Sequence, residues 1–238
     1  ATIGAHFVST SSPQFKNITT NTTHYGLKAA IASASSGQTI VPLTDCTVDG
    51  SDLITAENNT YTIPSGVTLL VPYDATNTIS TATVTRVQQQ NTPPTCYRTL
   101  TIANNINIIC NGIIDIGGIQ NNEGQTGVAV GGPRTHGQMI LNGGSTITLN
   151  NVLYCWGFIT GSGHITAKNG SKVYECLQVT DWRGGSCFNN MLNNVNKVFP
   201  LCQYYIQNVE VPITFEYGSQ NLVSTSVYIS NTNAYADN

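Results

Sequence analysis

Short alternating runs separated by small polar turns fill the stretch 135–185, and they constrain the fold more than any other feature. Asn142-Gly143-Gly144-Ser145 precedes the run 146–149 (TITL), and Asn169-Gly170-Ser171 precedes the run 172–175 (KVYE). Alternation of apolar and polar residues over such lengths is typical of β-strands with one buried face. This stretch is therefore expected to form short strands joined by tight turns.

The two turns lie at an interval that suggests a repeating coil. Ser145 and Ser171 are 26 positions apart, about the length of one coil of a β-solenoid. Between them, Ile159 and Ile165 follow glycine-rich or aromatic corners and fit the other two sides of a triangular coil. We therefore expect an all-β fold, built as a β-solenoid.

An amphipathic helix is predicted before the first coil, over residues 24–34 with Thr23 as its N-cap. Gly37 would end it, and residues 38–42 (QTIVP) read as the first strand. The alternative is an ordinary surface helix. Four apolar residues at helical spacing form one face of this helix: Leu27, Ala30, Ile31 and Ala34.

This order of helix, glycine and strand resembles the N-terminal cap of pectin-lyase-like right-handed β-helices. The run 111–118 (NGIIDIGG) resembles a structural strand and turn of polygalacturonase-type β-helices, with Ile116 in place of the glycine after Asp115. The resemblance covers roughly residues 23–230 as a fold pattern. It implies a right-handed parallel β-helix capped by the short N-terminal helix. Its core would hold Ile40, Val67, Leu69, Ile106, Ile108, Ile147, Leu149, Ile165 and Val173.

The chain divides into an N-terminal extended arm, residues 1–22, and a β-helix domain, residues 23–238, which is less regular from about 186. The arm would either pair along a strand edge or be ordered by a partner. Residues 72–97 and 117–132 are predicted to be loops that leave the coil.

Composition favours an uncharged, secreted surface. Only 9% of residues are charged, against a usual share of about 25%, and the net charge is −3. The sequence contains no basic run of the kind that would indicate nucleic-acid binding. It also contains no apolar run that approaches the roughly 20 residues of a membrane span. Since no hydrophobic signal segment stands at Ala1, we expect a processed chain located outside the cell, at a cell surface or on a virion.

Cysteines and glycosylation sequons agree with that location. Most of the seven cysteines are expected to be small buried residues, with one or two disulfides as the alternative. The predicted glycosylation sites are Asn17, Asn21, Asn58 and Asn169.

The acidic residues do not match the catalytic motifs of pectin depolymerases. Hydrolases of the resembled superfamily carry an Asp-Asp pair and a Gly-His-Gly motif, whereas Gly163-His164 is followed here by Ile165. Glycoside hydrolysis needs two carboxylates about 5 to 10 Å apart. The acid cluster of Asp45, Asp49 and Asp52 is expected to be a solvated turn, with no metal or other cofactor.

One constellation gives weak catalytic candidates: Glu175 and Asp181, with His164 and Arg183 nearby in the sequence. Alternation places Glu175 on the core face, where Arg183 would be its nearest partner. Alternatively, a bulge turns Glu175 to solvent.

Aromatic and threonine patterns offer two further surfaces. Tyr154, Trp156 and Phe158 alternate along one run, and would either pack inside or stand outward as a row that stacks on sugars. Thr-x-Thr pairs occur at 60/62, 99/101 and 146/148. Because their interval is not constant, we do not expect a flat threonine array of the ice-binding kind.

These features favour a non-enzymatic extracellular protein that serves in structure, assembly or adhesion, as part of a surface layer, fibre, filament or virion. Its partner would be a second copy of itself, since the alternating run at 223–229 approaches Asn238 without a capping helix. The alternative is a β-helix that binds or cleaves carbohydrate, with glycans as partners.

Overall fold

The computed structural model describes residues 12–73, 95–119, 135–176, 178–179, 205–206 and 209–224. Within these ranges the chain is mostly β-strand, with one α-helix and one short 3-10 helix. No helix in this part is long and apolar enough to cross a membrane. The all-β prediction is confirmed. The predicted loops and the irregular part near 186–200 lie largely outside the described residues.

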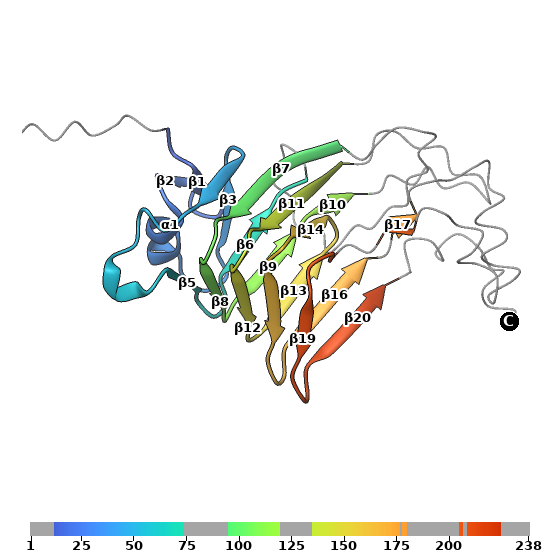
Figure 1. Ribbon diagram of the computed structural model, residues 1–238. Coiled ribbons are helices and arrows are strands. Elements are labelled where there is room, and N and C mark those ends of the chain that lie inside the picture. Colours follow the sequence, from blue (N-terminus) through green and yellow to red (C-terminus); the bar gives the residue numbers. More distant parts are fainter. Residues whose placement is uncertain are drawn as a thin grey trace, which may run out of the picture.

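Three sheets make up the body (Figure 1). Sheet A contains, in spatial order, β2 (Thr22–His24), β1 (Phe15–Asn17), β3 (Thr39–Pro42), β6 (Thr68–Val71), β9 (Ile113–Ile116), β13 (Val152–Cys155), β16 (Lys172–Cys176) and β20 (Gln220–Ser224). Sheet B contains β10 (Gly118–Ile119), β11 (Thr135–Leu141), β7 (Thr95–Ile102) and β4 (Cys46–Val48), and β14 (Phe158–Gly161) also pairs with β11. Sheet C contains β19 (Ile213–Phe215), β15 (His164–Ala167), β12 (Thr146–Leu149), β8 (Asn107–Cys110) and β5 (Thr60–Ile63). A small antiparallel ribbon joins β17 (Gln178–Val179) to β18 (Tyr205–Ile206).

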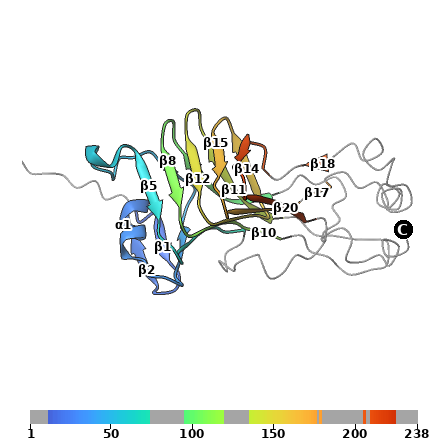
Figure 2. The ribbon, with the colours of Figure 1, turned by 90° about the horizontal axis from the view of Figure 1, so that it is seen from below.

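The chain visits the sheets in a fixed order, A then B then C. The first circuit is β3, β4, β5 and the second is β6, β7, β8; the third is β9, β11, β12 and the fourth is β13, β14, β15 (Figures 1 and 2). In the fifth circuit Val209 bridges to Ile159 of sheet B between β16 and β19. Strands of successive circuits pair in parallel, which requires a connection that leaves the sheet and returns. Here the other two sheets provide that connection.

The interior is filled by columns of aliphatic side chains. One column runs Ile40, Leu69, Ile114, Leu153, Val173, each in register with the next along sheet A. All nine predicted core residues are buried, so that prediction is confirmed. Burial of each large aliphatic side chain contributes roughly 1.5–3 kcal/mol, so these columns are the main stabilising feature of the body.

The structure contains both turns that were identified in the sequence. The prediction that the 26 residues between them make up one coil is wrong. Ser145 leads into β12 of sheet C, whereas Ser171 leads into β16 of sheet A. One circuit on sheet C runs from Thr146 to His164, which are 18 positions apart and in register. The interval of 26 residues therefore spans one full circuit and also the next step, from sheet C to sheet A. It exceeds one circuit because β13 is a separate strand of sheet A, which lies one circuit before β16.

Each of these turns depends on a glycine. Gly144 and Gly170 have φ of 74° and 81°, a region that favours glycine. The residue after each glycine donates its N–H to the carbonyl three positions earlier, as Ser171 does to Lys168 at 2.9 Å. This combination is typical of a type II turn.

The N-terminal helix exists but begins later than predicted. Helix α1 spans Leu27–Ser33 with Gly26, not Thr23, at its N-cap. Thr23 lies instead in β2, because residues 22–24 pair with β1. The predicted apolar face is confirmed: Leu27 and Ala30 are buried, and Ile31 and Ala34 pack against the core.

Part of the predicted arm is built into sheet A. Strand β1 pairs antiparallel with β3, and its residues Phe15 and Asn17 are buried. The first strand is therefore β1 and not the run at 38–42. For residues 15–17, the structure bears out pairing along a strand edge.

Two of the three Thr-x-Thr pairs share one face. Thr60 and Thr62 lie in β5, and Thr146 and Thr148 lie in β12, both of sheet C, while the pair at 99/101 belongs to sheet B. Uneven insertions between strands hide this alignment in the sequence. Because Asn107 and Ile109 of β8 lie between the two pairs, the expectation that no flat threonine array exists stays a prediction.

Candidate functional site

Two polar residues interrupt the aliphatic columns at the C-terminal end of the body: Glu175, which is buried, and Asn221, which is exposed. The column that begins with Ile40 and reaches Val173 continues in β20 with Asn221. The neighbouring column runs Val71, Ile116, Cys155 and then Glu175. Polar residues thus occupy one position in each of these two columns, in β20 and β16, while the second column continues with Val223 in β20.

Glu175 is fully buried and faces the interior, as the alternation in its strand predicts. Its Oε1 accepts a hydrogen bond from the backbone N–H of Val209 at 3.2 Å, and its Oε2 accepts one from the side-chain amide of Asn221 at 3.3 Å. Two such bonds compensate part of the cost of burying a carboxylate. They also join β16 to Val209 in the same circuit and to β20, the next strand of sheet A.

The other catalytic candidates do not join Glu175. His164 stands on the outer face of sheet C, where its Nε2 lies 2.8 Å from Oγ1 of Thr214. Asp181 and Arg183, the proposed second carboxylate and the expected ionic partner, lie outside the described residues. The two candidates that are described occupy different sheets and opposite faces, so they cannot act on one bond.

The last strands leave their far edges open within the described chain. Among the described strands, none pairs with the outer edge of β19 or β20. Phe215 of β19 occupies the core column of Ala167, yet 39% of its surface is exposed. An apolar core position next to an unpaired strand edge is a site at which further chain can add.

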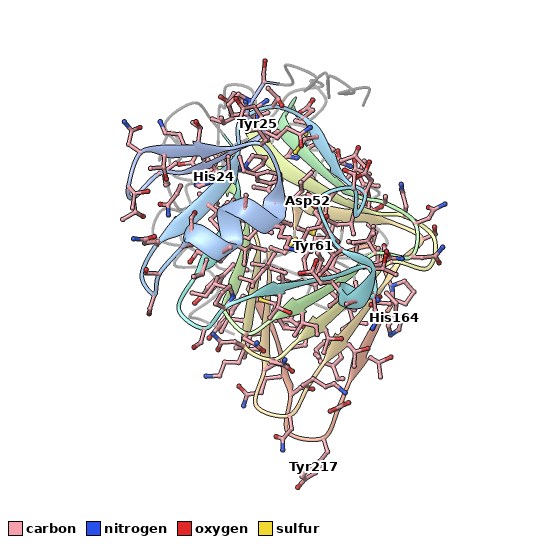
Figure 3. The ribbon with its side chains drawn as sticks, turned by 90° about the vertical axis from the view of Figure 1, so that its left-hand side faces the viewer. His24, Tyr25, Asp52, Tyr61, His164 and Tyr217 are labelled. Atoms are coloured by element: carbon pink, nitrogen blue, oxygen red, sulfur yellow. The ribbon has the colours of Figure 1, made fainter. Side chains whose placement is uncertain are left out.

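At the N-terminal end the outermost strands of the three sheets are β2, β4 and β5, and helix α1 packs against β1, β2 and β5. Asp52 accepts the backbone N–H of Lys28, in the first turn of α1, at 2.9 Å, and it also accepts the hydroxyl of Tyr61 from β5 (Figure 3). Burial, and then the hydrogen bond to Asp52, raise the pKa of the Tyr61 hydroxyl. Two hollows of about 370 and 140 Å³ flank this pair.

The acids of the predicted cluster have separate structural contacts. Asp45 accepts the backbone N–H of Thr99 at 2.8 Å, and Asp49 accepts that of Ser51 at 3.0 Å. The hydrogen bonds from Ser51 lower the pKa of the Asp49 carboxyl. Within the described residues, no group of three His, Cys, Asp or Glu side chains is arranged to hold a metal ion.

The aromatic row predicted at 154–158 is not a single row. Tyr154 lies in β13, Phe158 lies in β14, and Trp156 occupies the corner between them. Tyr154 stacks on Tyr174 of the next circuit, with ring centroids 4.9 Å apart and planes at 19°. Phe158 is buried and meets His136 edge to face at 4.6 Å. Each of these two tyrosine rings therefore covers one face of the other, and sugar binding at Tyr154, Trp156 and Phe158 stays a prediction.

The predicted glycosylation sites differ from one another in exposure, and so do the cysteines. Asn17 is buried and its amide donates to Gln38 at 2.8 Å, which disfavours the predicted glycosylation at this position. Asn21, Asn58 and Asn169 are exposed and stay predictions. Cys46 and Cys110 are buried without disulfides, and Cys96 is exposed.

Sequence reasoning missed Asn221, the backbone of Val209 and the Asp52–Tyr61 pair. One signal was present: residues 216–219 (EYGS) repeat the turn 168–171 (KNGS). Their alignment would have placed Asn221 beside Val173. No family model matches the chain, and no curated protein or solved structure matches it either.

Proposed function

We propose that this chain is a right-handed parallel β-helix that serves as a non-enzymatic structural protein outside the cell, in a surface layer, fibre or virion. The order of sheets A, B and C in every circuit supports the β-helix. Crossovers between parallel strands of one sheet are right-handed in about 98% of cases, which supports the hand. The exposed sequons and the low content of charged residues support the location.

The difference between the two ends carries the proposal. In sheet A, β1 and β2 lie outside β3, in the positions that a coaxial neighbour's last strands would need. Direct extension of sheet A at this end would therefore have to start from β2, a three-residue strand that is the outermost described strand there. The C-terminal end presents β19, β20 and the half-exposed ring of Phe215. Assembly or adhesion would use this end.

The acidic side chains favour this role over hydrolysis. Asp45, Asp49 and Asp52 hold backbone amides, and Glu216 pairs with Lys168 at 2.5 Å. Such contacts lock turns and neighbouring circuits together. Glycoside hydrolysis needs two carboxylates that flank one bond, and these four carboxylates are engaged in structural contacts instead.

Electron microscopy of the purified full chain tests the proposal. Filaments, sheets or regular oligomers are expected, whereas isolated single particles would contradict assembly. A reducing-sugar assay on plant and bacterial polysaccharides, with a glycan array beside it, tests the carbohydrate alternative. Release of sugar ends by the wild-type chain would replace the structural role with an enzymatic one.

A further inference from the structure

The outer face of sheet C carries two ranks of side chains, each in register from strand to strand. Alternate residues of these strands, such as Ile108 and Ile147, are buried in the core, so the ranks face outward. The first rank is Thr62, Ile109, Thr148, Thr166 and Thr214. The second rank is Thr60, Asn107, Thr146 and His164.

The two ranks form a regular two-dimensional grid. Neighbouring strands lie about 4.8 Å apart, and alternate residues of one strand lie about 6.6 Å apart, twice the rise per residue. Six of these nine positions are threonine, which carries a hydroxyl and a methyl group on a stiff β-branched carbon. Strands β5 and β12 present a threonine at both positions, whereas β8 presents Asn107 and Ile109 and β15 presents His164 and Thr166.

Hydrogen bonds hold several of these side chains in place without a ligand. Thr146 donates its hydroxyl to Oδ1 of Asn107 at 2.7 Å, and His164 lies 2.8 Å from the hydroxyl of Thr214. At the border of the face, Asn150 donates to Asn111 at 2.7 Å. A surface fixed in this way loses little conformational entropy when it binds.

The charge of the face fits an uncharged partner. Neither rank contains Asp, Glu, Lys or Arg, and at the border Lys168 and Glu216 neutralise each other. Neither rank contains a Phe, Tyr or Trp ring, and the only ring is the imidazole of His164, whose Nε2 lies 2.8 Å from the hydroxyl of Thr214. A single flexible ligand has no repeat of its own to match a two-dimensional grid. A solid surface with regularly spaced hydrogen-bonding groups has such a repeat and can match the grid at many points.

We propose that the outer face of sheet C binds the surface of ice. Ice offers an uncharged lattice of hydrogen-bond donors and acceptors, and the grid meets it with fixed hydroxyls between methyl groups. This inference does not depend on assembly through the C-terminal end, since it uses another surface and another partner.

Partition of the full chain into a slowly growing ice hemisphere tests the inference. The wild-type chain is expected to enter the ice, whereas an inert globular protein of similar size is excluded. Thr148→Lys and Thr166→Lys place a long charged side chain in the middle of the grid. Each should lower the incorporated fraction by about tenfold, and Thr62→Lys on the exposed edge strand should lower it in the same direction.

Thr101→Lys is the matched control, because Thr101 is a half-buried outward residue of sheet B with a parallel strand on each side. It should partition like the wild type. Circular dichroism before freezing confirms that every variant is folded. Exclusion of the wild-type chain from ice would overturn the inference, as would equal incorporation of the sheet C variants and the Thr101 control.

Discussion

The hydroxyl of Tyr61 donates a hydrogen bond to the carboxylate of Asp52, and this bond joins the first strand of sheet C to the helix that covers the N-terminal end. The other oxygen of the same carboxylate accepts the backbone N–H of Lys28 at 2.9 Å. A helix leaves its first N–H groups without partners inside the helix, and Asp52 satisfies one of them from a distant loop. The cap is thus held by a residue 24 positions beyond the N–H group that it caps.

Removal of this carboxylate should loosen the cap. Asp52→Ala leaves both the Tyr61 hydroxyl and the Lys28 amide without their acceptor, and we expect a loss of roughly 1.5–3 kcal/mol in the free energy of unfolding. Tyr61→Phe removes only one bond and should cost less. Urea denaturation followed by circular dichroism measures both. A cost for Tyr61→Phe that exceeds the cost for Asp52→Ala would contradict this arrangement.

Residue 26 must be glycine because Asp52 lies against it, and not because of its own backbone conformation. Its φ of −141° is open to any residue, but a Cβ there would lie 2.3 Å from Oδ2 of Asp52. Gly26→Ala should therefore destabilise the wild-type chain and have a much smaller effect in an Asp52→Ala background. A double-mutant cycle measures this coupling. If the two costs simply add, Gly26 and Asp52 do not compete for the same space.

The buried cysteines predict a loss of stability at alkaline pH. Burial raises the pKa of the Cys46 thiol to about 11 and that of Cys110 to about 12. Because both values lie above the unfolded-state pKa of about 9, the stabilising effect is complete below pH 9 and is lost as pH rises toward 11 or 12. The urea midpoint should fall more steeply over this range in the wild type than in Cys110→Ala. If the urea midpoints of the wild type and of Cys110→Ala change with pH in the same way, the Cys110 thiol has the same pKa in the folded and unfolded states.

Glycosylation should discriminate between the sequons. When the chain is secreted from a eukaryotic host, we expect glycans at Asn21, Asn58 or Asn169 and none at Asn17, whose side chain is buried against Gln38. Peptide mapping by mass spectrometry reads out each site. A glycan at Asn17 on folded protein would show that β1 is not packed as described.

Local patterns in the sequence predicted the nine core residues and the runs that form β12 and β16, and they favoured an inward position for Glu175. They could not give the register, because insertions of different length separate successive circuits. Thr62 and Thr148 stand in one rank although 86 positions separate them, and the partners of Glu175 lie 34 and 46 positions away. Helix α1 was predicted too long because the pairing of β2 with β1 overrode the local helical pattern.

Light scattering after size exclusion tests most directly the claim that the C-terminal end is the site of assembly. The wild-type chain at micromolar concentration should elute as an oligomer or filament. Phe215→Lys places a charge at the exposed core position and should shift the mass toward the monomer. Tyr217→Lys is the matched control, because this ring is 98% exposed at the tip of a turn and points away from the body (Figure 3). A monomeric wild-type chain, or a loss of assembly in Tyr217→Lys but not in Phe215→Lys, would contradict the account.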